Sequence, residues 1–323
     1  LNMIIQALSQ SGTFVADDIG MRFQDNRQEQ SFNAYICQQI ARLKRLGKIR
    51  TSETYTAAFR SFNGFMNDKE VLFNQISADL IAEYEAYLKG RGNSPNTISF
   101  YMRVLKAVYN RAVEDGLTGQ RHPFKSVYTG MEKTLKRAIS LNDLKRIKGL
   151  DLSLKPNLDF ARDMFLFCFY TRGMSFIDMA YLRKKDLQNG ILSYSRRKTG
   201  QQLFIKWERC MQEIVDKYPI NETEYLLPII TKRNKDYRKQ YTNELHRVNH
   251  LLKKIGKQLD LSIPLTMYVG RHSWASIAKS RNVPISVISE GMGHDSENTT
   301  QIYLASLDTS VVDRANKKIL DLL

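Results

Sequence analysis

Apolar residues recur at helical spacing through most of this chain, and the recurrence dissolves between His122 and Ala138. Before that break, four runs carry apolar residues three and four positions apart, and the third run stops at the turn Gly90-Arg91-Gly92. Such a period predicts amphipathic helices, and a long interruption between two helical regions predicts two separately packed units. The sequence therefore predicts a mainly α-helical protein with two domains.

The first predicted domain is a helical unit over residues 31–122. Its last helix begins at Ser94-Pro95-Asn96-Thr97, because a serine caps the first turn and a proline is tolerated there. Residues 1–30 are short and weakly patterned, and we interpret them as an N-terminal segment. Residues 123–138 contain Gly130 and a run of Lys and Arg, which predicts an exposed basic linker.

The second predicted domain covers residues 139–323 and begins at Ser140-Leu141-Asn142-Asp143, which resembles a capping box. Residues Ile191 to Trp207 depart from the helical period: they alternate in character around a turn at Lys198-Thr199-Gly200, which predicts a β-hairpin with a basic tip. A tail helix is predicted from an apolar stripe at helical spacing, formed by Leu307, Val311, Val312, Ala315, Ile319 and Leu320. The predicted fold class is mainly α with a small β-hairpin or sheet (α+β).

The charge of the chain limits its partners. The 323 residues include 49 Lys and Arg and 33 Asp and Glu, which gives a formal net charge of +16. Phosphate backbones attract such a field, and the release of their counterions supplies affinity. The longest apolar stretch is far shorter than the roughly 20 residues that span a bilayer. We therefore expect a nucleic-acid partner and no membrane.

Cofactors and metals find little support in the residue pattern. The cysteines Cys37, Cys168 and Cys210 lie far apart, which gives neither a disulfide framework nor a zinc pattern and favours a reducing cytoplasm. No Gly-x-x-x-x-Gly-Lys-Ser/Thr loop is present, so use of ATP is not expected. His246 and His250 are four apart, but the glutamate and third ligand of a helical zinc site are missing. We expect no cofactor and no metal site.

The last third of the chain holds residue types that suit phosphoryl transfer. Arg271 can hold two phosphate oxygens through its fixed fork, and His294, on a turn with flanking glycines, can share a proton near neutral pH. The oxygen of Tyr303 can attack phosphorus and store the bond as an ester. Each residue alone is as well explained by helix packing; together they form a coherent set.

The motifs that carry these residues resemble a known family. Tyr268-Val269-Gly270-Arg271-His272-Ser273-Trp274-Ala275, then Gly291-Met292-Gly293-His294 and Thr299-Thr300-Gln301-Ile302-Tyr303, are similar to the C-terminal signature of tyrosine recombinases, the phage-type integrases. The first helical unit and the pair Pro123-Phe124 resemble that family's core-binding domain. The overall pattern is similar to integrases of Bacteroides mobile elements.

The resemblance implies a site-specific DNA recombinase or integrase. Such an enzyme cleaves and rejoins double-stranded DNA through a 3′-phosphotyrosine intermediate, without ATP or metal, as a homo-tetramer on paired sites. It also implies a bacterial cytoplasmic, nucleoid-associated protein, with a host DNA-bending protein as a candidate accessory partner. Longer members carry an arm-binding domain, of which residues 1–30 are interpreted as a remnant.

The family's catalytic roles transfer residue by residue. By resemblance, Tyr303 is the nucleophile, Arg271 the second arginine, His294 the histidine before the nucleophile, and Lys198 the general acid at the hairpin tip. Tyr268 stands where the family has a further histidine, and it is expected to donate to a phosphate oxygen.

The first catalytic arginine is not where the family pattern has it. The family has this arginine three positions before an acidic residue. Asp178 is that acidic residue here, so the expected position is Ser175, and the nearest arginine in the sequence is Arg172. We take Arg172 as the candidate, while Arg196 and Arg197 on the hairpin remain alternatives. The residues assigned to DNA contact are Arg196, Arg197, Lys136, Arg137, Lys44, Arg45 and Arg50.

Three other functions stay open at this point. A catalytically inactive DNA-binding protein of the same fold would explain the irregular first arginine and Tyr268. A type IB topoisomerase-like enzyme would use the same chemistry without a partner duplex. A metal-dependent nuclease or transposase would need clustered carboxylates, which are not spaced persuasively here. The target sequence, and the choice among integration, excision and inversion, do not follow from the sequence.

Overall fold

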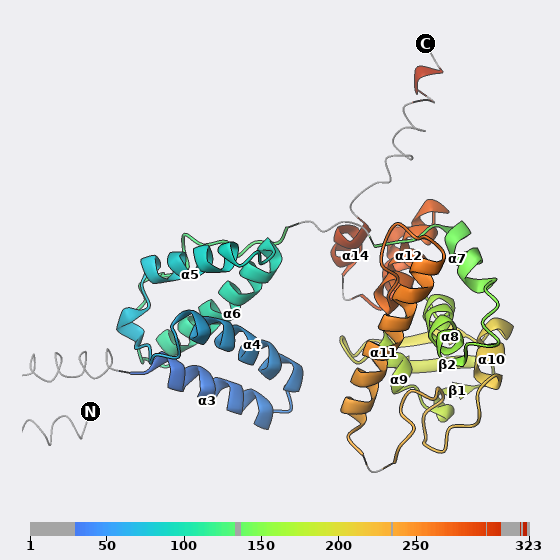
Figure 1. Ribbon diagram of the computed structural model, residues 1–323, viewed down its shortest axis with the longest axis horizontal. Coiled ribbons are helices and arrows are strands. Elements are labelled where there is room, and N and C mark those ends of the chain that lie inside the picture. The colour runs from blue at the N-terminus through green and yellow to red at the C-terminus, as the bar shows by residue number, and fades with distance from the viewer. Residues whose placement is uncertain are drawn as a thin grey trace, which may run out of the picture. The chain divides into compact units, whose positions relative to one another are not determined.

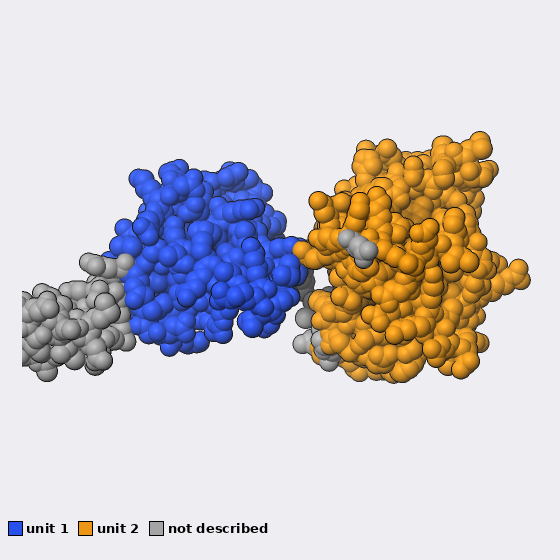
Figure 2. Space-filling model, turned by 90° about the horizontal axis from the view of Figure 1, so that it is seen from below, with its two compact units in different colours: residues 1–134 blue, residues 135–323 orange. Residues whose placement is uncertain are grey.

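The computed structural model describes residues 30–132, 137–233, 235–294, 296–304, 317 and 319–321, with the backbone alone for residues 298, 299, 302 and 303. The chain divides into two compact units, residues 1–134 and 135–323 (Figure 2). No helix among the described residues is long and apolar enough to cross a membrane. The predicted contact residue Lys136 lies outside the described residues.

Unit 1 is a bundle of helices around an aromatic core (Figure 1). Its described elements are α3 (Phe32–Arg45), α4 (Ile49–Phe65), the 3₁₀ turn η1 (Phe73–Gln75), α5 (Ala78–Gly90) and α6 (Pro95–Glu114). Ser31, Ser77 and Ser94 each accept a backbone N–H at the start of a helix, as a serine N-cap does. In the core, the rings of Phe32 and Phe62 meet edge to face.

Unit 2 is mainly helical and includes a small sheet. Its helices in the described residues are α7 (Leu141–Lys148), α8 (Pro156–Tyr170), α9 (Phe176–Ala180), α10 (Arg209–Asp216), α11 (Tyr237–Gln258), α12 (Met267–Ser280), α13 (Ile285–Met292) and α14 (Glu297–Leu304), with the 3₁₀ turn η2 (Lys184–Asp186). The sheet is antiparallel in the order β1 (Leu187–Gln188), β2 (Ile191–Ser195) and β3 (Gln202–Lys206). The predicted mainly α fold with a small hairpin or sheet is confirmed, and β1 adds a third strand to that hairpin.

The helix α8 is the centre of unit 2, because most of its residues from Phe160 to Cys168 are buried and α11 and α12 pack against it. Hydrogen bonds join three local features of unit 2. Arg271 contacts the turn after α8 at Gly173 and the end of α13 at Met292. Arg196, at the tip between β2 and β3, contacts the turn between α13 and α14 at Gly293. Of the predicted tail helix, Leu307, Val311, Val312 and Ala315 lie outside the described residues, whereas Ile319 and Leu320 are helical and exposed.

Candidate active site

Arg271 lies at the centre of the candidate site, on α12. Its side chain is buried, with 7% of the residue exposed. One terminal nitrogen donates to the carbonyl of Gly173 at 2.6 Å; the other donates to the carbonyl of Met292 at 2.8 Å and lies 2.9 Å from Nε2 of His294. A buried charge is tolerated only when its polar atoms are satisfied. These contacts use three of the five N–H groups of the guanidinium and fix the direction of its fork.

The hydrogen bonds of His294 define its tautomer. Arg271 can only donate, so Nε2 of His294 accepts, and a neutral ring then carries its hydrogen on Nδ1. That Nδ1–H donates to Oγ1 of Thr300 at 2.7 Å. Burial lowers the pKa of His294 to about 4, and the positive charges of Arg271, Arg196 and Lys198 act in the same direction. The imidazole is therefore neutral at pH 7, with its basic nitrogen toward the arginine.

The turn at Gly293 brings a second guanidinium into the same cluster. Gly293 ends α13 with a φ of +65°, and its carbonyl accepts a hydrogen bond from the buried Arg196. A Cβ at this position would lie 2.9 Å from Cδ1 of Leu203 and 3.1 Å from Cδ of Arg196, so glycine is required for both conformation and space. The successive carbonyls of Met292 and Gly293 thus hold one arginine each.

The hairpin tip directs neighbouring arginines to different surroundings. The carboxylate of Asp178 accepts the backbone N–H of Arg197 at 2.9 Å, and it also accepts the hydroxyl of Ser175 at 2.6 Å. The guanidinium of Arg197 lies over the ring of Tyr181, 4.0 Å from its centroid. Arg196, one residue earlier, reaches the Gly293 turn instead. Ser175, in the slot where the family has its arginine, serves as the N-cap of α9.

Lys198 lies at the exposed tip of the same hairpin, close enough to His294 that its charge lowers the histidine pKa. Its neighbour Thr199 donates weakly to the carbonyl of Gly293, at 3.5 Å. The tip and the Gly293 turn are therefore joined by contacts from Arg196 and Thr199. This arrangement places an ammonium group at the edge of the arginine and histidine cluster.

The guanidinium of Arg172 contacts the strand β3. Arg172 has a φ of +60°, and its guanidinium donates to the backbone carbonyl of Phe204 at 3.3 Å. Its side chain passes Gly291, where an added Cβ would lie 3.6 Å from Cδ of Arg172. The residue of this turn that meets Arg271 is Gly173, with a φ of +77° and room for no side chain. Among the candidates for the first arginine, Arg172, Arg196 and Arg197, it is Arg196 whose guanidinium contacts the Gly293 turn.

Tyr303 and Tyr268 complete the predicted catalytic residues. Tyr303 lies on α14, the helix that follows His294, and its side chain lies outside the described part of the chain. Tyr268 is half exposed on α12, and its ring meets that of His272 edge to face at 4.4 Å. Burial lowers the pKa of His272 to about 4, and Arg137 and Arg271 add to that effect. The described residues contain no cluster of three metal-ligating side chains.

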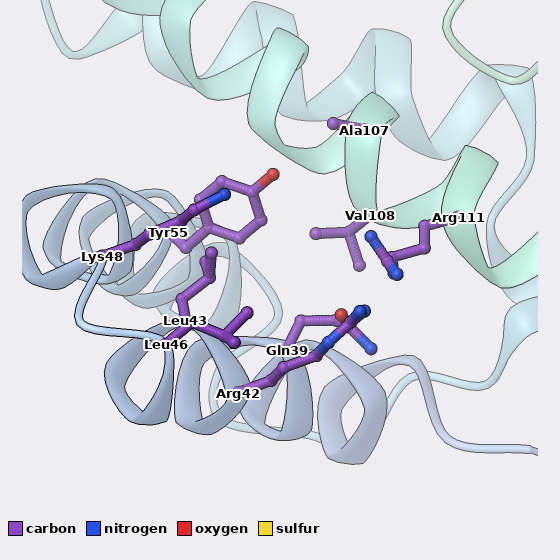
Figure 3. Close-up of a pocket in the computed structure, with 9 residues that line it drawn as sticks. All are labelled: Gln39, Arg42, Leu43, Leu46, Lys48, Tyr55, Ala107, Val108 and Arg111. Atoms are coloured by element: carbon purple, nitrogen blue, oxygen red, sulfur yellow. The ribbon is translucent and has the colours of Figure 1, made fainter.

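Unit 1 carries a separate cationic feature. A cleft of about 140 Å³ opens between α3, α4 and α6, as Figure 3 shows. The residues that line it are Gln39, Arg42, Leu43, Leu46, Lys48, Tyr55, Ala107, Val108 and Arg111. Three of these are cations and none is acidic. The predicted DNA contacts Lys44 and Arg45 are exposed on α3, and Arg50 is exposed on α4. Arg137 is exposed in unit 2.

Sequence reasoning missed several residues of the site. Gly173 and Thr300 hold Arg271 and His294 respectively, and Asp178 holds the hairpin tip. Thr300 lies in the motif that ends at Tyr303, and Gly173 is next to Arg172, but neither threonine nor glycine indicates chemistry by its residue type. Arg111 is far along the chain from Arg42 and Lys48, so only packing reveals their common cleft.

Comparisons with known proteins agree with this architecture. The phage integrase SAM-like domain matches residues 31–130, and the phage integrase family matches residues 154–310. The tyrosine recombinase XerD of Listeria innocua is 20% identical over 269 residues, 78% of this chain and 86% of that protein. A lambda integrase tetramer bound to a Holliday junction has a TM-score of 0.66 at 15% identity, covering 88% of this chain and 79% of the other. A Tn1549 transposon integrase in complex with a circular intermediate DNA has a TM-score of 0.62 at 17% identity, covering 88% and 99%.

A SAM-like helical domain followed by a mainly helical domain with these motifs defines a tyrosine recombinase. The chain belongs to the phage integrase family. Its activity is therefore site-specific recombination of DNA, and the expected enzyme class is confirmed.

Proposed function

We propose that Tyr303 is the nucleophile of this recombinase and that Arg271 and Arg196 hold the phosphate it attacks. The oxygen of Tyr303 forms a bond to phosphorus, the bond from phosphorus to the 5′-oxygen breaks, and a 3′-phosphotyrosine remains. His294 is neutral at pH 7, and its Nε2 takes the tyrosine proton by giving up the hydrogen bond from Arg271, while Lys198 gives a proton to the leaving 5′-oxygen. The bond energy stays in the ester, so rejoining needs no ATP and no metal.

The observation that carries this proposal is the pair of buried guanidiniums at one turn. Arg271 and Arg196 are held by the successive carbonyls of Met292 and Gly293. Two preorganised forks can bind the two non-bridging oxygens of a phosphodiester and stabilise the charge that develops on them. Arg196 therefore replaces Arg172 as our candidate for the first arginine. Tyr268, half exposed one turn before Arg271, is the candidate for a further donor to the phosphate.

We propose a homo-tetramer on two paired duplexes as the working assembly. The lambda integrase structure is a tetramer bound to a Holliday junction, and the transposon integrase structure contains a circular intermediate DNA. These similarities support a mobile-element integrase, for which we favour the Bacteroides type and a location at the bacterial nucleoid. A host DNA-bending protein is the accessory partner that we would test first.

Unit 1 is proposed to hold the DNA duplex through its cations. The cleft of Figure 3 has three of them and an apolar floor, so it presents positive charge that no lining carboxylate offsets. Phosphate contacts of this kind position a protein on a duplex without reading its sequence. Lys44, Arg45 and Arg50 extend the same surface, and Arg137, Arg197 and Lys136 are the proposed contacts of unit 2.

Covalent trapping tests the chemistry directly. The full chain is incubated in chelator with nicked duplexes from the flanks of its own element, beside Tyr303→Phe, and products are separated on denaturing gels. We expect a protein–DNA adduct that the phenylalanine variant does not form. If the wild-type chain binds the duplex and forms no adduct, the protein is an inactive DNA-binding member of this fold.

The same assay separates the candidate arginines. Arg196→Ala is expected to slow adduct formation about 10²- to 10³-fold, the range for loss of one charge-stabilising donor. Arg172→Ala should cost far less, because that guanidinium contacts Phe204. The reverse order would return the first-arginine role to Arg172. A second measurement separates a recombinase from a topoisomerase-like enzyme. A recombinase transfers the cleaved strand to a second duplex, whereas a topoisomerase-like enzyme relaxes a single one.

A further inference from the structure

The helix that carries Tyr303 is held on both sides of that residue. Thr300, three positions before it, is fully buried, and its hydroxyl oxygen lies 2.7 Å from Nδ1 of His294. Leu304, directly after it, is 2% exposed and packs with Ala275, Ile288 and Met292. The position of Tyr303 on α14 is therefore set by contacts one turn or less away.

Lys279 adds a polar anchor at the end of this helix. Its ammonium donates to the backbone carbonyl of Leu304 at 2.8 Å. A hydrogen bond from a charged donor is stronger than one between neutral groups, so this contact fixes the backbone of α14 at Leu304. Lys279 is half-buried in the last turn of α12, and α14 lies beside α12 and α13 (Figure 1).

The same two contacts connect α14 to the arginine and histidine cluster. Arg271 and Lys279 both belong to α12, eight residues and therefore about 12 Å apart along one rigid helix. Thr300 contacts His294, which in turn contacts Arg271. The middle of α14 is tied to Arg271 through His294, and its last residue, Leu304, is tied to the same helix α12 through Lys279.

We propose that Lys279 and Thr300 are positioning residues that hold the Tyr303 helix in register with Arg271 and His294. Lys279 acts through the backbone of Leu304. Thr300 acts through His294, because it accepts the Nδ1–H and so holds the ring in the orientation in which Nε2 faces Arg271. The inference rests on the proposed role of Tyr303 as nucleophile, and it adds two residues that touch neither substrate nor the reacting atoms.

Matched substitutions test the two anchors in the full chain. Lys279→Met keeps the length of the side chain and removes the charge, whereas Lys279→Arg keeps a cation. Thr300→Val keeps the shape and removes the hydroxyl, whereas Thr300→Ser keeps the hydroxyl. Ser280→Ala, at the exposed neighbour of Lys279, is the control. Each variant is compared for DNA dissociation constant, thermal midpoint and single-turnover rate of adduct formation on saturating nicked duplex.

Lys279→Met and Thr300→Val are expected to lower the single-turnover rate about 10²-fold, the cost of a small misplacement of reacting groups. The DNA dissociation constant should stay unchanged, and Lys279→Arg and Thr300→Ser should recover most of the rate. Thr300→Val should also change the pH profile of cleavage, because the Nδ1–H of His294 loses its acceptor. A residue that only stabilises the fold would move the thermal midpoint and leave that profile alone.

The outcomes separate this inference from the function on which it rests. If the wild-type chain forms no adduct, or Tyr303→Phe still forms one, the proposed nucleophile is wrong. If the wild-type adduct depends on Tyr303 while Lys279→Met and Thr300→Val cleave at the wild-type rate, the positioning roles are overturned. They are equally overturned if Lys279→Arg and Thr300→Ser lose as much rate as their partners do.

Discussion

The two units of this recombinase bury different kinds of residues. Among the described residues, the buried polar side chains of unit 1 are uncharged: Gln39, Ser52, Ser99 and Thr118. Unit 2 buries the charged residues Asp163, Asp178, Arg196 and Arg271. Burying a charge costs several kcal/mol unless it is well paired, so a fold keeps one only for a purpose. Unit 1 leaves its cations at the surface, where they suit contact with a large anion.

The partners of these buried charges separate structural from chemical roles. Asp163 accepts from Arg162, Lys217 and Tyr218, a closed network in which opposite charges meet. Arg271 is held by two backbone carbonyls and a neutral imidazole, which use three of its five N–H groups and leave its positive charge in place. A charge kept in a low-dielectric site without a carboxylate is ready for an anionic substrate.

Replacing Arg271 should give the largest effect and tests this contrast most directly. We expect Arg271→Ala to lower the rate of adduct formation by about 10³- to 10⁵-fold, as loss of a transition-state arginine does in phosphoryl transfer. DNA affinity should change little, because the cations of unit 1 remain. Rate and affinity are measured on the same nicked duplex, at saturation and by titration.

Arg271→Lys is the matched variant, since it keeps the charge and loses the planar fork that contacts Gly173, Met292 and His294. It should remain strongly impaired. If Arg271→Lys recovers most of the rate, positive charge alone matters at this position. The two units would then differ in whether their cations are buried or exposed, and the planar fork of Arg271 would not be needed.

The sequence predicted the helices, the hairpin and the membership of Arg271 and His294 in one set, because periodicity and short motifs are local. It did not predict which arginine joins that set. Arg172 and Arg196 look alike in sequence, and the difference depends on the left-handed turn at Arg172 and Gly173 and on the anchoring of Arg197 by Asp178. These are properties of the packed structure.

The cleft in unit 1 gives the next largest effect. Arg42→Gln together with Arg111→Gln should weaken DNA binding and reduce the slope of log affinity against log salt by about 2, or about 1 for each cation that no longer neutralises a phosphate. The rate of adduct formation on saturating DNA should not change. Affinity is titrated at several salt concentrations.

Lys44→Gln with Arg45→Gln is the comparison pair, because both residues belong to the proposed contact surface on α3 but neither lines the cleft, and we expect it to lower the slope less. An equal decrease in slope would mean that the whole surface, rather than the cleft, contacts the phosphates. An unchanged slope in the Arg42 and Arg111 variant would remove the cleft from the proposed DNA contact.

The smallest expected effect is a pH dependence of stability confined to unit 2. Burial lowers the pKa of both His272 and His294 from 6.5 to about 4. Between these values the unfolded chain binds more protons than the folded one, so stability falls as the pH decreases from about 6.5 toward 4 and is fully present above that window. Unit 1 contains one histidine, His122, and it is exposed.

Hydrogen exchange resolved by peptide measures this difference in the full chain, with rates corrected for the intrinsic effect of pH. Amides of α8 and α12 should lose protection between pH values of about 6.5 and about 4.5, whereas those of α4 and α6 should keep theirs. His294→Asn should reduce the loss in unit 2, because one of the two depressed histidines is gone. Equal loss of amide protection in both units would show that the buried groups of unit 2 do not determine its loss of stability at low pH. The two units would then differ only in how they bind DNA.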